Sequence, residues 1–199
     1  MRNFQLFTCF CLLYAACGFT QVMPSVVVPD FSLRNASDNT MFSTAADQGV
    51  KGYMVVFTCN HCPFAKLYTQ RFNNLHARYR VLGVPLLAIN SMDTVVYEDE
   101  VFELMQQKAR AENIKYPYLQ DADQRVGQSF DAQHTPQAYV IWKEKGQWVV
   151  KYSGAIDDNG EHPENATPFI ANAVDELLAG KQVSNPQTQS FGCRIFYRN

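Results

Sequence analysis

The residues best suited to chemistry are two cysteines in the segment CNHCP, residues 59–63. An apolar run, residues 53–58, precedes them and an amphipathic stretch follows, so the sequence places the pair between a buried strand and the start of a helix. Free N–H groups and the positive dipole end at a helix start stabilise a thiolate and lower its pKa. Because the proline falls in the first helical turn, it does not break the helix.

This placement predicts a redox pair, with a distinct role for each residue. We expect Cys59 to be exposed and nucleophilic, and Cys62 to be shielded and to resolve the mixed disulfide. His61 lies between them and, when protonated, would donate a hydrogen bond to the Cys59 thiolate. Stabilising the thiolate favours the reduced form, which makes the couple more oxidising.

Other uses of the two cysteines compete with a redox pair. A structural disulfide between them would close almost no loop and stabilise little. Zinc would usually need a second pair of ligands, and only Cys193 and scattered histidines remain. A copper-binding module that uses Cys59, Cys62 and His134 stays open as an alternative, since soft thiolates and imidazole suit copper.

A second motif, Thr135-Pro136, precedes an expected strand at residues 138–142. A proline at a strand entrance facing a Cys-x-x-Cys pair is predicted to be cis, whereas an ordinary strand-edge proline would be trans. In such an arrangement the residue before the proline offers backbone groups to an extended substrate. Thr135 and Pro136 therefore join the candidate site.

The N-terminus has the order of a secretory signal peptide, which we place at residues 1–20. Arg2 supplies a basic start, residues 4–17 are mostly apolar, and small residues follow. The apolar stretch is too short for a comfortable transmembrane helix of about 20 residues. We expect an exported protein, periplasmic or secreted, without a membrane span in the mature chain. A lipid anchor at Cys17 is the less favoured alternative, because Tyr14 stands where Leu or Val is usual.

Export changes the count of cysteines. Removal of a signal peptide leaves Cys59, Cys62 and Cys193. An odd number leaves at least one thiol unpaired within the monomer. Cys193 could resolve a disulfide, cross-link a partner, or be buried and inert.

Composition favours one globular domain, at residues 21–184, followed by a tail at 185–199. The chain has 199 residues, of which 47% are hydrophobic and 18% charged, with a formal net charge of −2. This balance excludes a disordered chain and offers no basic surface for nucleic acid. The expected partners are protein or small-molecule disulfides and thiols, together with an unidentified redox partner.

The hydrophobic pattern predicts an α/β sandwich with a mixed central sheet and helices on both faces. Residues 26–33 are β-rich, and residues 35–52 form a loop with a short hairpin. The remaining expected strands are 53–58, 84–90, 138–142 and 148–152, and the expected helices are 64–79, 97–112, 123–130 and 168–179.

Several segments together resemble a thioredoxin-like redoxin family of the AhpC/TSA-related kind. They are FTCNHCPF, LLAINS, YPYLQDADQRVGQSFDA, the TP before AYVIW, YSGAIDD and the closing FGCRI. The resemblance covers residues 26–197. It implies a thioredoxin-like fold, with Cys59 and Cys62 as the redox pair and Pro136 as the cis-proline. The expected activity is thiol–disulfide exchange, which needs no organic cofactor.

The chain also departs from its relatives. His134 stands where relatives often have a cysteine, and the strand at 53–58 lacks the buried acid of thioredoxins, whose proton-transfer role would fall to His61 or water. The peroxiredoxin signature Pro-x-x-x-Thr-x-x-Cys is missing, with Val56 at the threonine position. An antioxidant thiol peroxidase, in which Cys59 passes through sulfenic acid, is therefore the alternative activity.

Overall fold

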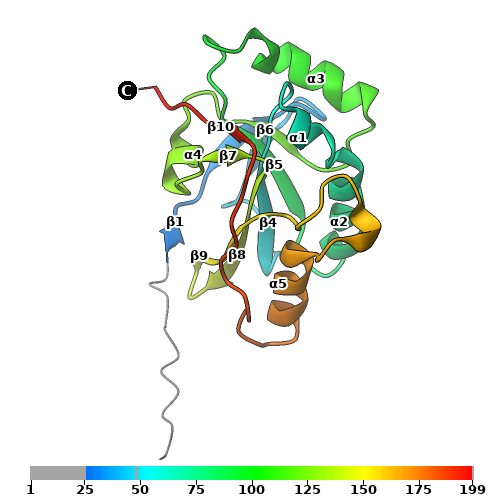
Figure 1. Cartoon of the computed structure of the whole chain (residues 1–199). Helices are drawn as coiled ribbons and strands as arrows, with labels where there is room; N and C mark the ends of the chain where they lie inside the picture. Colours follow the sequence, from blue (N-terminus) through cyan, green and yellow to red (C-terminus); the bar gives the residue numbers. More distant parts are fainter. Residues whose placement is uncertain (1–25, 48, 199) are drawn as a thin grey trace, which may run out of the picture.

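A computed structural model describes residues 26–47 and 49–198 of the chain (Figure 1). The expected signal peptide, with Cys17, lies outside the described residues. Within the described part, no helix is long and apolar enough to cross a membrane.

The core of the fold is one mixed eight-stranded sheet of order β1-β9-β8-β4-β5-β6-β2-β3. Strand β4 pairs in parallel with β5, which pairs in parallel with β6, while the other neighbours are antiparallel. A separate antiparallel pair joins β10 to β7. The strands are β1 (Val27–Val28), β2 (Ser32–Asn35), β3 (Met41–Ser43), β4 (Gly52–Phe57), β5 (Leu86–Asn90), β6 (Tyr118–Gln120), β7 (His134–Thr135), β8 (Gln137–Glu144), β9 (Gln147–Gly154) and β10 (Cys193–Arg194).

Five α-helices and two short 3₁₀ turns connect these strands. The helices are α1 (Pro63–Lys66), α2 (Thr69–Arg80), α3 (Phe102–Ala111), α4 (Arg125–Ser129) and α5 (Phe169–Leu178), and the turns are Glu98–Glu100 and Pro163–Asn165. The mixed α/β architecture predicted from the sequence is confirmed.

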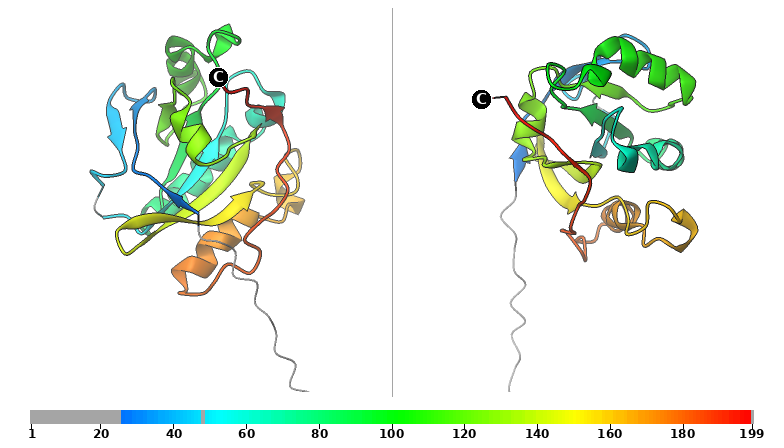
Figure 2. Two further views of the ribbon diagram at one scale, coloured as in Figure 1. Left: turned by 90° about the vertical axis from the view of Figure 1, so that its left-hand side faces the viewer. Right: turned by 45° about the horizontal axis from the view of Figure 1, so that its top comes forward.

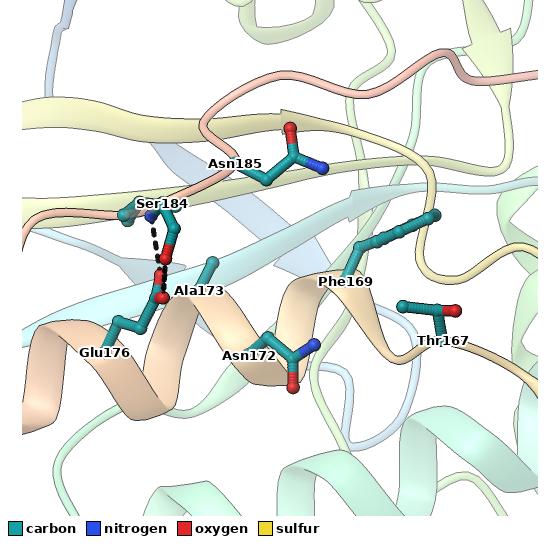
Figure 3. A pocket seen from close by; sticks show the side chains of 8 residues that line it. Thr167, Phe169, Asn172, Ala173, Glu176, Ser184 and Asn185 are labelled. Carbon is teal, nitrogen blue, oxygen red and sulfur yellow. Dashed lines mark hydrogen bonds between the residues drawn. The ribbon is translucent and has the colours of Figure 1, made fainter. Parts of the chain in front are cut away.

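The segment after α5 returns across the molecule instead of leaving it. It runs from the end of α5 back over the sheet to β10, which lies beside β7, and continues from there to the C-terminus (Figures 1 and 2). Between α5 and the start of this segment lies a pocket of about 240 Å³, lined by residues that include Phe169, Glu176 and Ser184 (Figure 3).

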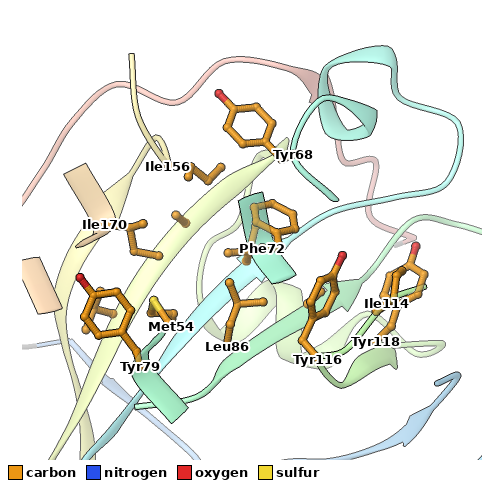
Figure 4. Packing of buried hydrophobic residues seen from close by; sticks show 14 of the residues in the cluster. Met54, Tyr68, Phe72, Tyr79, Leu86, Ile114, Tyr116, Tyr118, Ile156 and Ile170 are labelled. Carbon is orange, nitrogen blue, oxygen red and sulfur yellow. The ribbon is translucent and has the colours of Figure 1, made fainter. Parts of the chain in front are cut away.

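One face of the sheet packs against α2, α3 and α5. Met54 and Val56 of β4 point to this side, where they meet apolar side chains such as Phe72, Met105 and Ile170 (Figure 4). Alternation along a strand sends neighbouring residues to opposite faces. Strand β4 is buried along its whole length because both of its faces are covered.

The other face is covered by α4 and by the returning C-terminal segment. Val55 and Phe57 of β4 pack there with Phe130 of α4 and with Ile195 from the C-terminal segment. Cys59 and Cys62 belong to this same cluster, with Cys193 packed at its edge.

Two expected helices are broken or shortened. The helix expected at 64–79 divides into α1 and α2, because Leu67 and Tyr68 donate to carbonyls three residues back, as in a 3₁₀ turn. The helix expected at 97–112 begins only at Phe102, after the 3₁₀ turn.

Three short strands were not expected. β6 has three residues, and β7 and β10 have two each. Runs this short leave no readable alternation, and their pairing depends on partners far along the chain.

Candidate thiol–disulfide site

The two cysteines of the CNHCP segment lie where the central strand ends and the first helix begins. Cys59 follows β4 by two residues, and Cys62 is the N-cap residue of α1, with extended backbone angles. The expected placement between strand and helix is therefore confirmed. Since β4 is held on both sides by β5 and β8, the start of the motif is fixed by the middle of the sheet.

Thr135 lies against both cysteines. The antiparallel pairing of β8 with β4 sets Gln137 opposite Phe57, which brings the preceding residues to the motif. The hydroxyl oxygen of Thr135 lies 3.1 Å from the Cys59 sulfur, and its carbonyl oxygen lies 3.1 Å from the Cys62 sulfur. The Thr135–Pro136 peptide bond is cis, as the sequence predicted.

The disulfide of the structure joins Cys62 to Cys193. Their Cα atoms are 6.0 Å apart, and 131 positions separate them in the sequence. Cys59 is a free thiol. Cys193, whose role the sequence left open, is thus paired with the second cysteine of the motif, and the exchange between Cys59 and Cys62 stays a prediction.

The environment of Cys59 differs from the expected one. Its side chain is fully buried instead of exposed. Burial raises the pKa of the Cys59 thiol to about 11, and the negative charge of Glu100 adds to the increase. The Thr135 hydroxyl and the backbone N–H of Cys62 act in the opposite direction but do not compensate. The expectation of a lowered pKa is therefore wrong for this state, because desolvation outweighs the helix start.

Glu100 is a site residue that the sequence analysis missed. Its side chain is 1% exposed, although it comes from the 3₁₀ turn before α3. The carboxylate accepts hydrogen bonds from the backbone N–H groups of Asn60 and His61, at 2.8 and 2.9 Å, and from the side-chain amide of Asn90, at 2.6 Å. Nothing local in the sequence distinguishes Glu100 from the exposed acids beside it.

His61 turns toward Glu100 and not toward the sulfur. Its Nδ1 lies 2.6 Å from a carboxylate oxygen of Glu100, and its ring stacks on Tyr97 with centroids 4.6 Å apart. The expected hydrogen bond from His61 to Cys59 is replaced by this hydrogen bond to Glu100. The buried acid at this site, Glu100, therefore comes from the 3₁₀ turn before α3 and not from β4.

The copper-ligand set of Cys59, Cys62 and His134 is not assembled in this state. The Cys62 sulfur is bonded to another sulfur, and Nδ1 of His134 lies 3.3 Å from the Ser190 hydroxyl. One ligand atom each of Cys59, His61 and Glu100 lie within 4.8 Å of one another instead.

The fold and this site together define a thioredoxin-like protein, with a Cys-x-x-Cys segment between strand and helix opposite a cis-proline. Similar solved structures include a hypothetical protein from Sinorhizobium meliloti 1021, with 28% identity and a TM-score of 0.78 over 89% of this chain and 96% of that one. An uncharacterized conserved protein from Geobacillus kaustophilus has 31% identity and a TM-score of 0.76, over 88% and 97%. A thiol:disulfide interchange protein from Chlorobium tepidum TLS, at 19% identity and a TM-score of 0.51 over 64% and 83%, shares the fold.

The sequence itself gives the family. The profile of the AhpC/TSA family matches residues 24–157, and the chain belongs to that family. Cys59, Cys62 and Pro136 lie inside the matched region, whereas Cys193 lies beyond it. Among curated proteins, none matches this sequence.

Proposed function

We propose that this protein is a thiol–disulfide oxidoreductase that works through Cys59 and Cys62. The observation that carries the proposal is the placement of both sulfurs against Thr135, at the junction of β4, α1 and β8. Membership of a redoxin family supports redox chemistry at these two residues.

The reaction begins when the Cys59 thiolate attacks a substrate disulfide. One substrate sulfur leaves as a thiolate, and the other stays bonded to Cys59. Once Cys62 is a free thiolate, it attacks the Cys59 sulfur and releases the second substrate thiolate, which leaves a Cys59–Cys62 disulfide. The reverse sequence oxidises a substrate dithiol. In both directions the Cys62 backbone N–H and the Thr135 hydroxyl stabilise charge on the Cys59 sulfur.

In the state that the structure describes, with Cys62 bonded to Cys193, Cys59 cannot attack a substrate disulfide. With a pKa of about 11, Cys59 is protonated near neutral pH, and its burial denies access to a substrate. Exchange therefore needs an opening of the site that hydrates Cys59. Glu100, the buried carboxylate closest to the motif, is the group that we assign to accept the thiol proton.

We also propose that the protein is exported to the periplasm or secreted. The basic start and apolar stretch of residues 1–20 support a signal peptide. A disulfide between distant residues is consistent with this, since such bonds persist in oxidising compartments. Mass spectrometry of the protein recovered from cells tests it. A mature N-terminus near residue 20 is expected. A lipid attached to Cys17 would show that the protein is exported with a lipid anchor instead. An intact Met1 would contradict export.

Two substitutions test the proposed exchange. Cys59→Ser should abolish dithiol exchange with a model disulfide, because the attacking sulfur is gone. Cys62→Ser should accumulate mixed disulfides on Cys59, because the resolving sulfur is gone. Ser184→Ala, which changes an exposed residue beside α5 and outside the site, serves as the control and should retain activity. Full activity in both site variants would overturn the assignment.

A thiol peroxidase is the second candidate. The hydroxyl that the sequence lacked at Val56 is supplied by Thr135, 3.1 Å from the Cys59 sulfur. In this alternative, peroxide oxidises Cys59 to a sulfenic acid and Cys62 condenses with it, releasing water. Steady peroxide consumption with a thiol donor would favour the peroxidase, and slow stoichiometric oxidation would favour disulfide exchange.

A further inference from the structure

We propose that Cys193 is a third redox-active cysteine, and that the Cys62–Cys193 disulfide is a capped state of the exchange site which Cys59 opens by internal disulfide exchange. The inference rests on the thiol–disulfide function proposed above. It adds a reacting residue from the C-terminal segment, outside the region that the family profile matches.

The C-terminal segment lies along the Thr135 edge of the site. Strand β10 pairs with β7 so that Cys193 lies opposite Thr135. This is the backbone edge that an extended substrate would use in the arrangement predicted from the sequence. The chain therefore covers its own substrate edge with a strand that carries a cysteine.

The fit of this strand leaves no room for a side chain at position 192. Gly192 has a φ of 150°, and a Cβ atom there would lie 2.2 Å from the carbonyl oxygen of Thr135. Glycine thus lets the backbone approach the Thr135–Pro136 edge closely enough for the next residue to reach Cys62.

The segment is also anchored on both sides of Cys193. On one side, Thr188 donates its backbone N–H to the carbonyl of Ser153 at 3.0 Å. On the other side, Ile195 is 2% exposed and donates to the carbonyl of Gln133, and the Tyr197 hydroxyl donates to the carbonyl of Ala132. These contacts hold the segment at the site in addition to the disulfide.

A free thiol lies beside this disulfide. Cys59 and Cys62 both contact Thr135, through its hydroxyl and its carbonyl oxygen respectively. Thiol–disulfide exchange proceeds by attack of a thiolate on a disulfide sulfur, so Cys59 is placed to react with the Cys62–Cys193 bond once it ionises.

The internal step is balanced without any added oxidant or reductant. The Cys59 thiolate attacks the Cys62 sulfur and forms a Cys59–Cys62 bond. The Cys62–Cys193 bond breaks, and Cys193 leaves as a thiolate that takes up the proton lost by Cys59. One disulfide and one thiol are present before and after the step, so no electrons enter or leave the protein.

The step changes what holds the C-terminal segment in place. Before it, Cys193 is tied covalently to the start of α1. After it, only hydrogen bonds and packing hold β10 against β7, and a substrate strand can compete for Thr135. The disulfide has then moved to the pair that exchanges with substrates.

Peptide mapping of the full chain follows this step, because trypsin separates the cysteines suitably. Cleavage after Lys51 and Lys66 leaves Cys59 and Cys62 in one peptide, and cleavage after Lys181 and Arg194 leaves Cys193 in another. Where residues 1–20 are still attached, their cysteines fall in a third peptide, residues 3–34, which is resolved from the other two. Iodoacetamide added under native conditions for increasing times labels each thiol that becomes accessible.

In the oxidised wild-type protein, the two peptides should be cross-linked at first. With time, label should appear on Cys193 while the other peptide becomes internally bridged between Cys59 and Cys62. The Cys59→Ser variant should keep the cross-link and show at least a tenfold slower labelling of Cys193. Equal labelling of Cys193 in this variant, label on Cys59 with the cross-link retained, or no cross-link in the oxidised protein would each overturn the inference.

A matched pair of glycine substitutions tests the fit of β10. Gly192→Ala should reduce the cross-linked fraction several-fold, because its Cβ meets Thr135. Gly146→Ala also changes a glycine with positive φ. A Cβ atom added at Gly146 would meet no other atom within 4 Å, so the cross-link should be unchanged. Equal effects of the two substitutions would contradict the role of the strand.

Failure of the inference is distinguishable from failure of the proposed function. If Cys193 is never labelled but Cys59→Ser abolishes dithiol exchange, the redox pair stands and the third cysteine does not. If Cys59→Ser retains full dithiol exchange, the proposed function fails as well.

Discussion

The two faces of the central sheet differ in what their side chains do. The face under α2, α3 and α5 is packed with apolar and aromatic side chains such as Met54, Phe72 and Ile170, and its cluster contains no cysteine. The opposite face, under α4 and the C-terminal segment, includes Cys59, Cys62 and the edge residue Cys193 in its packing. The cysteine sulfurs therefore lie within a hydrophobic core, where burial raises the pKa of the Cys59 thiol, although Cys62 caps α1.

The largest effect should come from the face without cysteines. Phe72 is 1% exposed and packs against Tyr68 and Tyr116. Phe72→Ala should lower the free energy of unfolding by about 3–5 kcal/mol, through lost burial and a cavity. Denaturant unfolding measures the loss, and disulfide mapping of the folded variant should still find Cys62 bonded to Cys193. A loss of unfolding free energy below about 1 kcal/mol, or a disulfide other than Cys62–Cys193, would contradict the assignment of stability to one face and of the cysteines to the other.

The next effect concerns the cross-link on the other face. The disulfide constrains the unfolded chain between residues 131 positions apart, so Cys193→Ser should destabilise the oxidised protein by about 2–4 kcal/mol. Denaturant unfolding with and without reductant checks this. Reductant should lower wild-type stability to that of the variant and change the variant little, since a Cys59–Cys62 bond closes almost no loop. A variant as stable as the oxidised wild type would contradict it.

A smaller effect should separate Glu100 from the acids around it. Glu100→Gln removes a negative charge that raises the pKa of Cys59, so this pKa should fall from about 11. A fall of about one unit would increase the thiolate fraction near pH 8 roughly tenfold. In the wild type, the fraction should rise about tenfold per pH unit until the pH approaches the pKa. Lys108 acts in the opposite direction to Glu100.

Ultraviolet absorbance of the thiolate against pH measures this shift, with Cys59→Ser as the subtracted reference. Glu98→Gln is the matched control, because it changes an exposed acid on the same 3₁₀ turn. A pKa of Cys59 that is unchanged or raised in Glu100→Gln would contradict the role of the charge.

The smallest effect is expected at the pocket beside α5. Ser184 hydrogen-bonds Glu176 there through an exposed contact (Figure 3). Ser184→Ala should change the free energy of unfolding by no more than about 0.5 kcal/mol and leave the rate of Cys193 labelling unaltered. A tenfold change in the labelling rate of Cys193 would show that the pocket is coupled to the cysteine site, which would contradict this prediction.

The features that the sequence predicted correctly are those that depend on neighbouring residues in the chain. The continuous apolar run of β4, the Cys-x-x-Cys start of α1 and the proline before β8 are local features, and the structure has them where they were expected. The burial of Cys59 was missed because it depends on Thr135 and Glu100, which arrive from other parts of the chain. The partner of Cys193 could not be chosen because it depends on the path of the C-terminal segment back to β7.

The bond between Cys62 and Cys193 also turns most of the chain into a closed ring. If the two ends of the oxidised protein were pulled apart, tension would pass through the disulfide, and the 131 residue steps between the cysteines would bear no load. At roughly 3.4 Å per residue, the ring withholds on the order of 450 Å of extension. Cutting that bond, from within by Cys59 or from outside by a reductant, converts a short tether into a long one.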